Sequence, residues 1–208
     1  MPRGSKELSA ARREEIMNAC ASLYETMSFK DITVKEISKF ISTTRTSIYN
    51  YFRTKEEIFL AIFKREYEYW IEDLTRLADE NDRMSSDEFA SALASSLEKR
   101  QLLLKLLSMN MYDMEENSGM PRLVEFKKAY GNSMQAVKRC LSKFFPHMTE
   151  QEKQDFIFTF FPFIYGIYPY TFVTEKQRTA MERAGVEYKF MSVYEISYME
   201  IKKLLGSH

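Results

Sequence analysis

The stretch "ISTTRTSIYNYFRTKEE", residues 41–57, combines hydroxyl groups, two arginines and three aromatic rings within less than about five helical turns. A solvated surface helix would more often carry Glu, Lys and Ala, and a core helix would not carry the hydroxyls. On a wheel of about 100° per residue, Ile48 and Phe52 share one side and Asn50 points away from them. The pattern predicts a short helix with a narrow buried ridge and a broad polar and aromatic outer face.

The composition favours helices over the whole chain. The protein has 208 residues, of which 45% are hydrophobic and 29% charged, so a packed core is feasible and disorder is not expected. It has only 6 glycines and 5 prolines, and no period-2 run bounded by hairpin turn signals occurs. We therefore predict an all-α fold.

Charge is unevenly distributed although the formal net charge is zero. Residues 1–55 contain ten basic and six acidic residues, a net charge of +4, so the remainder carries −4. A basic N-terminal part on an acidic body indicates a polyanionic partner for that part alone. Cys20 and Cys140, the two cysteines, do not suggest a disulfide framework, and Cys20 is expected to be a reduced core residue.

The N-terminal part is predicted to contain three helices, at 9–27, 33–40 and 44–52. In "TVKE", the Thr33 hydroxyl would cap the second helix while Glu36 reaches back, and Thr44 would cap the third. The two short helices then form a helix-turn-helix over residues 33–52.

Further helices are predicted over the body at 54–81, from 86, around 102–111, and at 122–145, 149–173 and 186–205. The last has an apolar seam with heptad-like spacing suited to a helical bundle. The seam residues are Val186, Phe190, Val193, Ser197, Ile201 and Leu204.

The outer face of the 44–52 helix suits duplex DNA. A helix that enters the major groove needs short polar side chains near its N-terminal end, as Thr46, Ser47 and Asn50 provide. Tyrosine hydroxyls can contact the sugar-phosphate walls, and Lys55 can hold a phosphate. The alternative is that the tyrosines are packing aromatics and the basic residues are solvated charges.

Two segments resemble the TetR family of one-component regulators: "IMNACASLYETMSFKD" at 16–31 and "ITVKEISKFISTTRTSIYNYFRTKEEIFLAIF" at 32–63. The resemblance covers about residues 9–69. It implies a helix-turn-helix DNA-binding domain at 9–69 and a helical ligand-sensing and dimerisation domain at 70–208. It also implies that nine residues contact DNA: Thr33, Thr44, Arg45, Thr46, Ser47, Tyr49, Asn50, Tyr51 and Lys55. The family usually has Gly in the turn where Ser42 stands, and a left-handed Ser would cost about 1 kcal/mol.

The implied function is transcription regulation, with repression the commoner family mode, released when a small-molecule effector binds the body. Aromatic and Met side chains suit apolar or aromatic effectors, although such residues are more often simply core. No cofactor is expected. The candidate pocket residues are Tyr67, Trp70, Met109, Tyr112, Phe126, Tyr130 and Met134.

A homodimer is expected because one short helix reads few base pairs, whereas two helices can read a palindromic operator with half-sites about 34–36 Å apart. The helices at 156–173 and 186–205 would pair in a four-helix bundle, although their aromatics could instead fill a monomer core. The candidate interface residues are Phe160, Phe163, Ile164, Ile167, Phe190, Val193 and Ile201.

The uncharged run 156–173 has roughly the length of a membrane span, but Pro162, Gly166 and Pro169 interrupt it, so we expect a buried helix and no membrane partner. No signal peptide is evident, so the cytoplasm is the expected location.

Two other classes of protein remain alternatives. An enzyme is not expected, because there is no Gly-rich phosphate loop, nucleophile elbow or His-rich metal spacing. The acidic run at 113–116 is read as a solvated helix end rather than a metal site. The other alternative is a helical adaptor that binds protein through the body without a small-molecule ligand.

Overall fold

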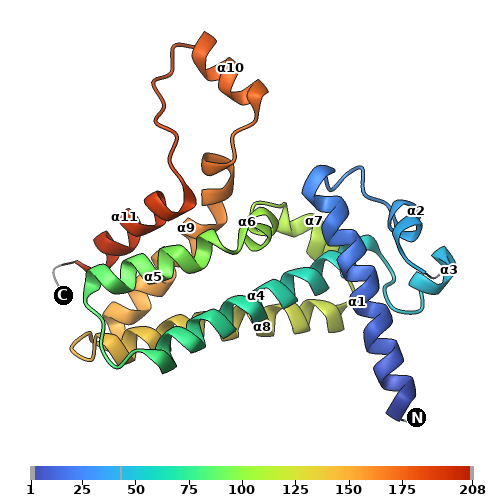
Figure 1. The fold of residues 1–208 in the computed structure, drawn as a ribbon, viewed down its shortest axis with the longest axis horizontal. Coiled ribbons are helices and arrows are strands. Elements are labelled where there is room, and N and C mark those ends of the chain that lie inside the picture. The colour runs from blue at the N-terminus through green and yellow to red at the C-terminus, as the bar shows by residue number, and fades with distance from the viewer. Residues whose placement is uncertain (1–2, 43, 207–208) are drawn as a thin grey trace. The chain divides into compact units, whose positions relative to one another are not determined.

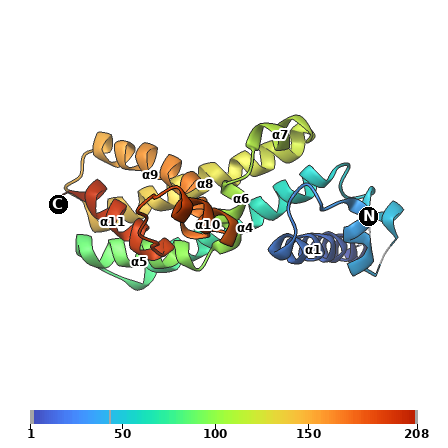
Figure 2. The same ribbon diagram turned by 90° about the horizontal axis from the view of Figure 1, so that it is seen from above.

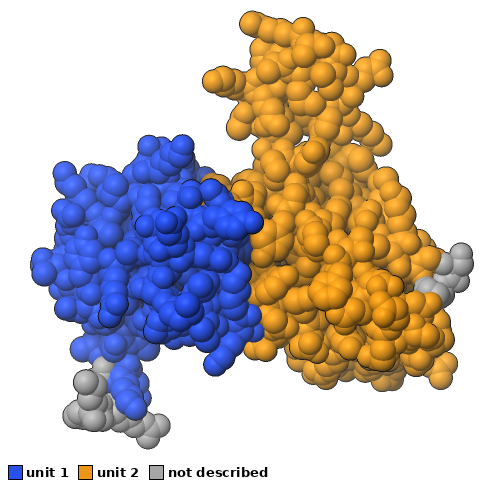
Figure 3. Space-filling model, turned by 180° about the vertical axis from the view of Figure 1, so that it is seen from behind, with its two compact units in different colours: residues 1–65, 110–129 blue, residues 66–109, 130–208 orange. Residues whose placement is uncertain are grey.

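The computed structural model describes residues 3–42 and 44–206, and all regular structure among them is helical (Figure 1). The predicted all-α fold is confirmed. The chain forms two compact units, coloured separately in Figure 3: unit 1 contains residues 1–65 and 110–129, and unit 2 contains residues 66–109 and 130–208.

Unit 1 contains three N-terminal helices near the predicted positions, the third of which ends at Ile48 rather than at residue 52, together with the whole of one later helix and parts of two others. Its core combines apolar residues of the first helix with the helix-turn-helix and the start of α4, and the ring of Tyr24 lies edge-on to Phe59 at 5.1 Å. The elements are α1 (Arg3–Thr26), α2 (Val34–Ile37), the 3₁₀ turn η1 (Ser38–Phe40), α3 (Arg45–Ile48), the first part of α4 (Lys55–Glu80), α7 (Met111–Glu116) and the start of α8 (Met120–Phe144).

Unit 1 includes residues 110–129, which lie beyond the predicted domain boundary at residue 69. The reason is apolar packing: Phe126 of α8 stacks on Phe63 of α4 with centroids 4.9 Å apart, and Met114 of α7 is buried. The segment 110–129 thus completes the core around the helix-turn-helix.

Unit 2 is a helical bundle. Helix α11 packs along α5 and against α9, and α6 packs on α9 (Figures 1 and 2). The elements are the remainder of α4 and α8, with α5 (Ser86–Glu98), α6 (Gln101–Leu107), α9 (Glu150–Thr171), α10 (Glu175–Arg183) and α11 (Val193–Leu205).

The C-terminal helix starts later than predicted. Ser192 and Glu195 form a reciprocal capping box that begins α11, so Val186 and Phe190 lie before the helix and not in its seam. Helix α10 was not predicted. The predicted 102–111 helix is divided between α6 and α7, because the side chain of Asn110 caps a new helix.

Helix α9 buries much of the uncharged run inside unit 2: Phe156, Phe160 and Phe161 are almost fully buried. Pro162 and Pro169 lie within the helix. In the part of the chain that the structure describes, no single helix is long and apolar enough to cross a membrane. Among the described residues, only α9 and α10 taken together have the length and composition of a membrane span, and the two helices are bent by 83° at the break between them.

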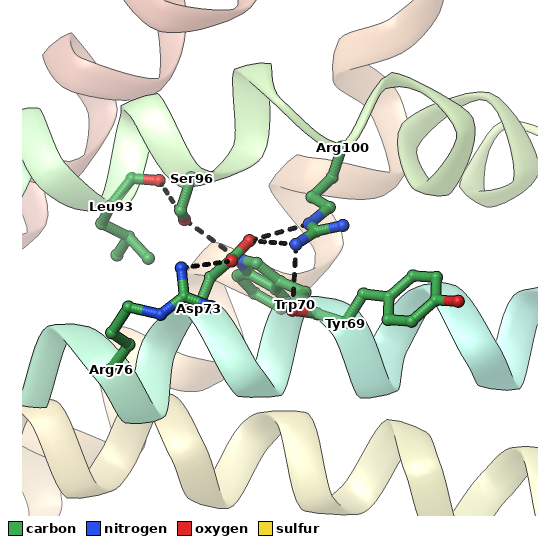
Figure 4. Close-up of polar contacts among 7 residues, drawn as sticks. All are labelled: Tyr69, Trp70, Asp73, Arg76, Leu93, Ser96 and Arg100. Atoms are coloured by element: carbon green, nitrogen blue, oxygen red, sulfur yellow. Dashed lines mark hydrogen bonds and ion pairs between the residues drawn. The ribbon is translucent and has the colours of Figure 1, made fainter.

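A polar cluster inside unit 2 connects α4 to α5 and to Arg100, the residue that precedes α6 (Figure 4). The indole Nε1 of Trp70 donates to Ser96 Oγ at 3.0 Å, and that hydroxyl donates to the carbonyl of Leu93 at 2.7 Å. Nearby, Arg100 donates from Nε and Nη2 to the same oxygen of Asp73, at 2.8 and 2.5 Å. The buried indole is therefore satisfied by a single hydroxyl.

Ser96→Ala is expected to lower the free energy of unfolding by about 1–3 kcal/mol, because it leaves the buried Trp70 N–H without an acceptor. Urea unfolding followed by tryptophan fluorescence measures the change. The matched control is Ser95→Ala, at the half-buried preceding position, which should change the value by less than about 0.5 kcal/mol. Equal effects of the two variants would contradict a stabilising role for the Trp70–Ser96 hydrogen bond.

Candidate DNA-binding interface

Helix α3 has the orientation that its sequence predicts. The Thr44 hydroxyl caps it by accepting from the amide of Ser47 at 3.3 Å, while Ile48 and the following Phe52 are buried. Thr46 and Asn50 are exposed. The buried ridge therefore fixes the polar face toward solvent.

The other predicted DNA-contacting residues are also accessible. Besides the exposed Thr46 and Asn50, the exposed set is Thr33, Thr44, Arg45 and Tyr49, and the half-buried set is Ser47, Tyr51 and Lys55. All nine lie between Thr33, the N-cap of α2, and Lys55, the first residue of α4, so one unit of the protein presents them together.

Phe52 is held by two guanidinium groups. The guanidinium carbons of Arg13 and Arg122 lie 5.2 and 5.7 Å from its ring centroid, within cation–π range. Arg122 also donates from Nη2 to the carbonyl of Tyr51 at 3.4 Å and pairs with Glu125 at 3.0 Å. Burial, followed by the nearby charge of Arg122, lowers the pKa of Arg13. The C-terminal end of the α3 region is thus fixed from both α1 and α8.

The turn before α3 is held by α1 rather than by a glycine. Glu15 accepts from the amide of Ser42 at 2.6 Å and pairs with Arg12 at 2.7 Å, and Arg12 also donates to the Ser42 hydroxyl. Among the described residues no non-glycine has positive φ, so the predicted strain at Ser42 is wrong. Thr43, also placed in this turn by the sequence, lies outside the described residues. The Ser42 amide lowers the pKa of Glu15 to about 2.

Thr33 caps α2 as predicted, accepting from the amide of Glu36 at 3.2 Å. The reciprocal half of the predicted capping box is not formed, because the Glu36 carboxylate pairs with Lys39 at 2.6 Å. One side of the box is therefore replaced by an i,i+3 ion pair, and the Thr33 hydroxyl remains exposed.

Lys55 connects the start of α4 to the loop between α1 and α2. Its ammonium donates to the carbonyls of Phe29 and Ile32 at 2.8 and 3.2 Å and lies 4.1 Å from the Phe29 ring centroid. An ammonium group has three donors, so these two bonds leave one for another acceptor.

Glu57 is not among the predicted DNA-contacting residues. It is buried, and its two oxygens accept from the amides of Arg53 at 2.8 Å and Gly119 at 3.1 Å. Thr54 caps α4 and donates to the carbonyl of Asn117 at 2.9 Å. These bonds tie the segment after α3 to the α7–α8 turn, which lies too far along the sequence for local pattern to reveal it.

The structure brings together part of the predicted effector pocket. In unit 2, Tyr130 lies edge-on to both Tyr67 and Phe161, with centroids 5.9 and 5.6 Å apart, and Trp70 lies 6.0 Å from Phe161. Burial raises the pKa of Tyr67.

Two predicted pocket residues lie elsewhere: Tyr112 is 85% exposed on α7, and Phe126 packs in unit 1. Met109 and Met134 are half-buried.

The predicted dimer contacts need correction. Five of the seven residues are buried within one protomer, so they are not available to a partner: Phe160, Ile164, Ile167, Val193 and Ile201. Phe163 is half-buried and Phe190 is exposed. The sequence could not distinguish the buried face of α9 from its exposed face, because aromatic residues occur on all sides of the helix.

Comparison with known proteins agrees with this geometry. The family described as "Bacterial regulatory proteins, tetR family" matches residues 16–62, and "Tetracyclin repressor-like, C-terminal domain" matches residues 64–193. The chain therefore belongs to the TetR family of DNA-binding transcriptional regulators. A comparison with curated proteins finds no match.

Solved structures share the fold at low sequence identity. A TetR/AcrR-family transcriptional regulator from Thermobifida fusca YX-ER1 has a TM-score of 0.64 and 17% identity, covering 95% of this chain and 98% of that one. The fatty acid degradation regulator FadR from Bacillus halodurans has a TM-score of 0.62 and 13% identity, covering 94% and 95%. A TetR-family regulator from Mesorhizobium loti MAFF303099, described as putative, has a TM-score of 0.61 and 14% identity, covering 95% and 96%.

The matching families describe regulators rather than enzymes. No group of three or more His, Cys, Asp or Glu residues that could hold a metal ion occurs among residues 3–42 and 44–206.

Glu15 should make the stability of unit 1 depend on acid pH. Its pKa is about 2 in the folded state against an ordinary 4.5, so its contribution is full above pH 4.5 and is lost as pH falls toward 2. Urea unfolding of the wild type and of Glu15→Gln, from pH 7 to pH 3, measures the free energy of unfolding of each protein. We expect the wild type to be the more stable at pH 7, and the difference in free energy between the two proteins to decrease below pH 4.5. A gap independent of pH would contradict the Glu15–Ser42 contact.

Proposed function

We propose that this protein is a transcriptional repressor that binds a palindromic operator as a homodimer in the cytoplasm and is released by a small-molecule effector. The observation that carries the proposal is the outward polar face of α3, anchored from behind by Ile48 and Phe52. The basic N-terminal part of the chain adds long-range attraction to DNA.

The nine predicted DNA-contacting residues divide into two proposed roles. Thr46, Ser47 and Asn50 contact base edges in the major groove, where short polar side chains allow close approach. The remaining residues contact phosphates and sugars and so fix the position of the helix without reading sequence. These are Thr33, Thr44, Arg45, Tyr49, Tyr51 and Lys55.

The proposed dimer face is the exposed side of α9 and α11. Phe158, Pro162, Gly166 and Tyr170 recur every four residues on α9 and are exposed, as is Met199 on α11. An exposed row of this kind on one helix, in which Phe158 and Tyr170 leave large rings in water, indicates a partner surface. A twofold axis through this face pairs two helices from each copy in a four-helix bundle.

The proposed effector is apolar or aromatic and lies near Tyr67, Trp70 and Tyr130 in unit 2. These aromatic side chains supply apolar contact, and the Tyr130 hydroxyl can orient a ligand. The similar Bacillus halodurans protein is a fatty acid degradation regulator, so fatty acids are reasonable first probes. An effector that favours a conformation unable to bind the operator lowers DNA affinity through linkage.

Fluorescence anisotropy with DNA from upstream of its own gene tests the proposal. We expect salt-sensitive binding that prefers a palindrome over a scrambled sequence of equal length. Asn50→Ala and Thr46→Ala should each weaken specific binding by about tenfold, and Lys55→Met should reduce the salt slope by about 1. Ser142→Ala, an exposed position on α8, is the control and should have no effect.

Binding without preference for any palindrome, or unaffected by the α3 substitutions, would contradict the DNA-binding proposal. The alternative, a helical adaptor, would then be favoured. A monomeric protein at every concentration that binds one half-site would contradict the homodimer alone.

A further inference from the structure

The segment 172–192, here called the arm, connects α9 to α11 and projects from the rest of unit 2 (Figures 1 and 3). Its central element is α10, which has nine residues and no buried residue. An isolated helix of this length is not stable in water, since helices shorter than about 12–15 residues are marginal even with favourable sequences. Packing against another surface would supply the missing stabilisation.

The ends of α10 are nevertheless well specified. The Thr174 hydroxyl accepts from the amide of Gln177 at 3.2 Å. At the other end, Gly185 has φ of 66°, its amide bonds the carbonyl of Glu182, and the amide of Val186 bonds the carbonyl of Met181. This is a Schellman motif. The sequence therefore encodes a helix with defined ends but gives it no core.

The segments that precede and follow α10 are also held together. The Tyr188 hydroxyl donates to the carbonyl of Tyr170 at 2.9 Å, and the Arg178 guanidinium lies 4.2 Å from the ring centroid of Phe190. Tyr188 and Phe190 lie edge-on, 4.9 Å apart. The arm is thus an organised element rather than a loose loop.

The arm leaves apolar side chains in water. Phe172, Val186 and Phe190 are 37%, 51% and 40% exposed. They continue from Tyr170, the last residue of the exposed row on α9 that we propose as the dimer face. In the proposed dimer, whose face includes both helices that flank the arm, the arm adjoins the second copy.

Charge supports the same occupant. The arm has four basic and three acidic residues, whereas the rest of unit 2 has fifteen acidic and eleven basic residues. A weakly basic element therefore meets an acidic body when it crosses to the partner.

We propose that the arm is an exchange arm: in the homodimer it lies against unit 2 of the second copy and buries Phe172, Val186 and Phe190 there. This inference rests on the proposed homodimer and adds to it a reciprocal contact outside the four-helix bundle. Each copy gives one arm and receives one, as a twofold axis requires.

Crosslinking in mixed-isotope dimers tests the exchange. Val186→Cys is labelled with a benzophenone maleimide and mixed, in ¹⁴N and ¹⁵N forms, under conditions that exchange subunits. The native thiols should not react, because Cys20 and Cys140 are buried and burial raises their pKa to about 12 and about 11. Arg76→Cys, on the exposed part of α4, is the labelling control.

We expect irradiation to give covalent dimers whose adducts pair ¹⁴N and ¹⁵N peptides from unit 2, with few from the Arg76→Cys control. Adducts confined to single subunits, or no adducts from a protein that is dimeric, would overturn the inference.

A second measurement separates the arm from the bundle. The double variant Val186→Glu with Phe190→Glu should raise the dimer dissociation constant by about tenfold or more in sedimentation equilibrium. Thr179→Glu, an exposed polar position of the same arm, should have little effect. If the double variant dimerises and binds DNA like the wild type, the proposed exchange of arms is contradicted, whereas the proposed function is not. If the wild type itself is monomeric, the proposed homodimer fails.

Discussion

Burial of Ile48 and Phe52 is the constraint on which the DNA-binding surface depends. Helix α3 has four residues, too few to be stable alone or to hold an orientation by its own hydrogen bonds. The two buried side chains fix it against unit 1, and Arg13 and Arg122 lie within cation–π distance of the Phe52 ring. Any rotation that exposed the anchor would also carry Thr46 and Asn50 away from solvent.

The surroundings of α3 are fixed by charged groups from distant parts of the chain. Glu15 of α1 holds the turn before the helix through the Ser42 amide, and Glu57 of α4 holds the segment after it together with the α7–α8 turn. Carboxylates that accept backbone amides are strong hydrogen-bond partners. They allow a turn without glycine and a four-residue helix to keep a defined geometry. Glu57 also connects the segment after α3 to Gly119, within residues 110–129 of unit 1.

The sequence predicted what depends on local pattern. The caps at Thr33 and Thr44, the buried ridge of α3 and the long helices followed from hydroxyl positions and apolar spacing. Contacts between distant residues could not be predicted, and neither Glu57 with Gly119 nor Phe63 with Phe126 has a local signal. Helix α10 was missed because it has no apolar period, although its N-cap and its C-terminal glycine were visible.

The central claim, that α3 enters duplex DNA with its polar face, can be tested most directly by hydrogen–deuterium exchange of the protein with and without its operator. The account predicts that peptides covering residues 44–52 become strongly protected on binding, with smaller protection at Thr33 and Lys55. Protection confined to unit 2, with unchanged exchange over residues 44–52, would contradict it.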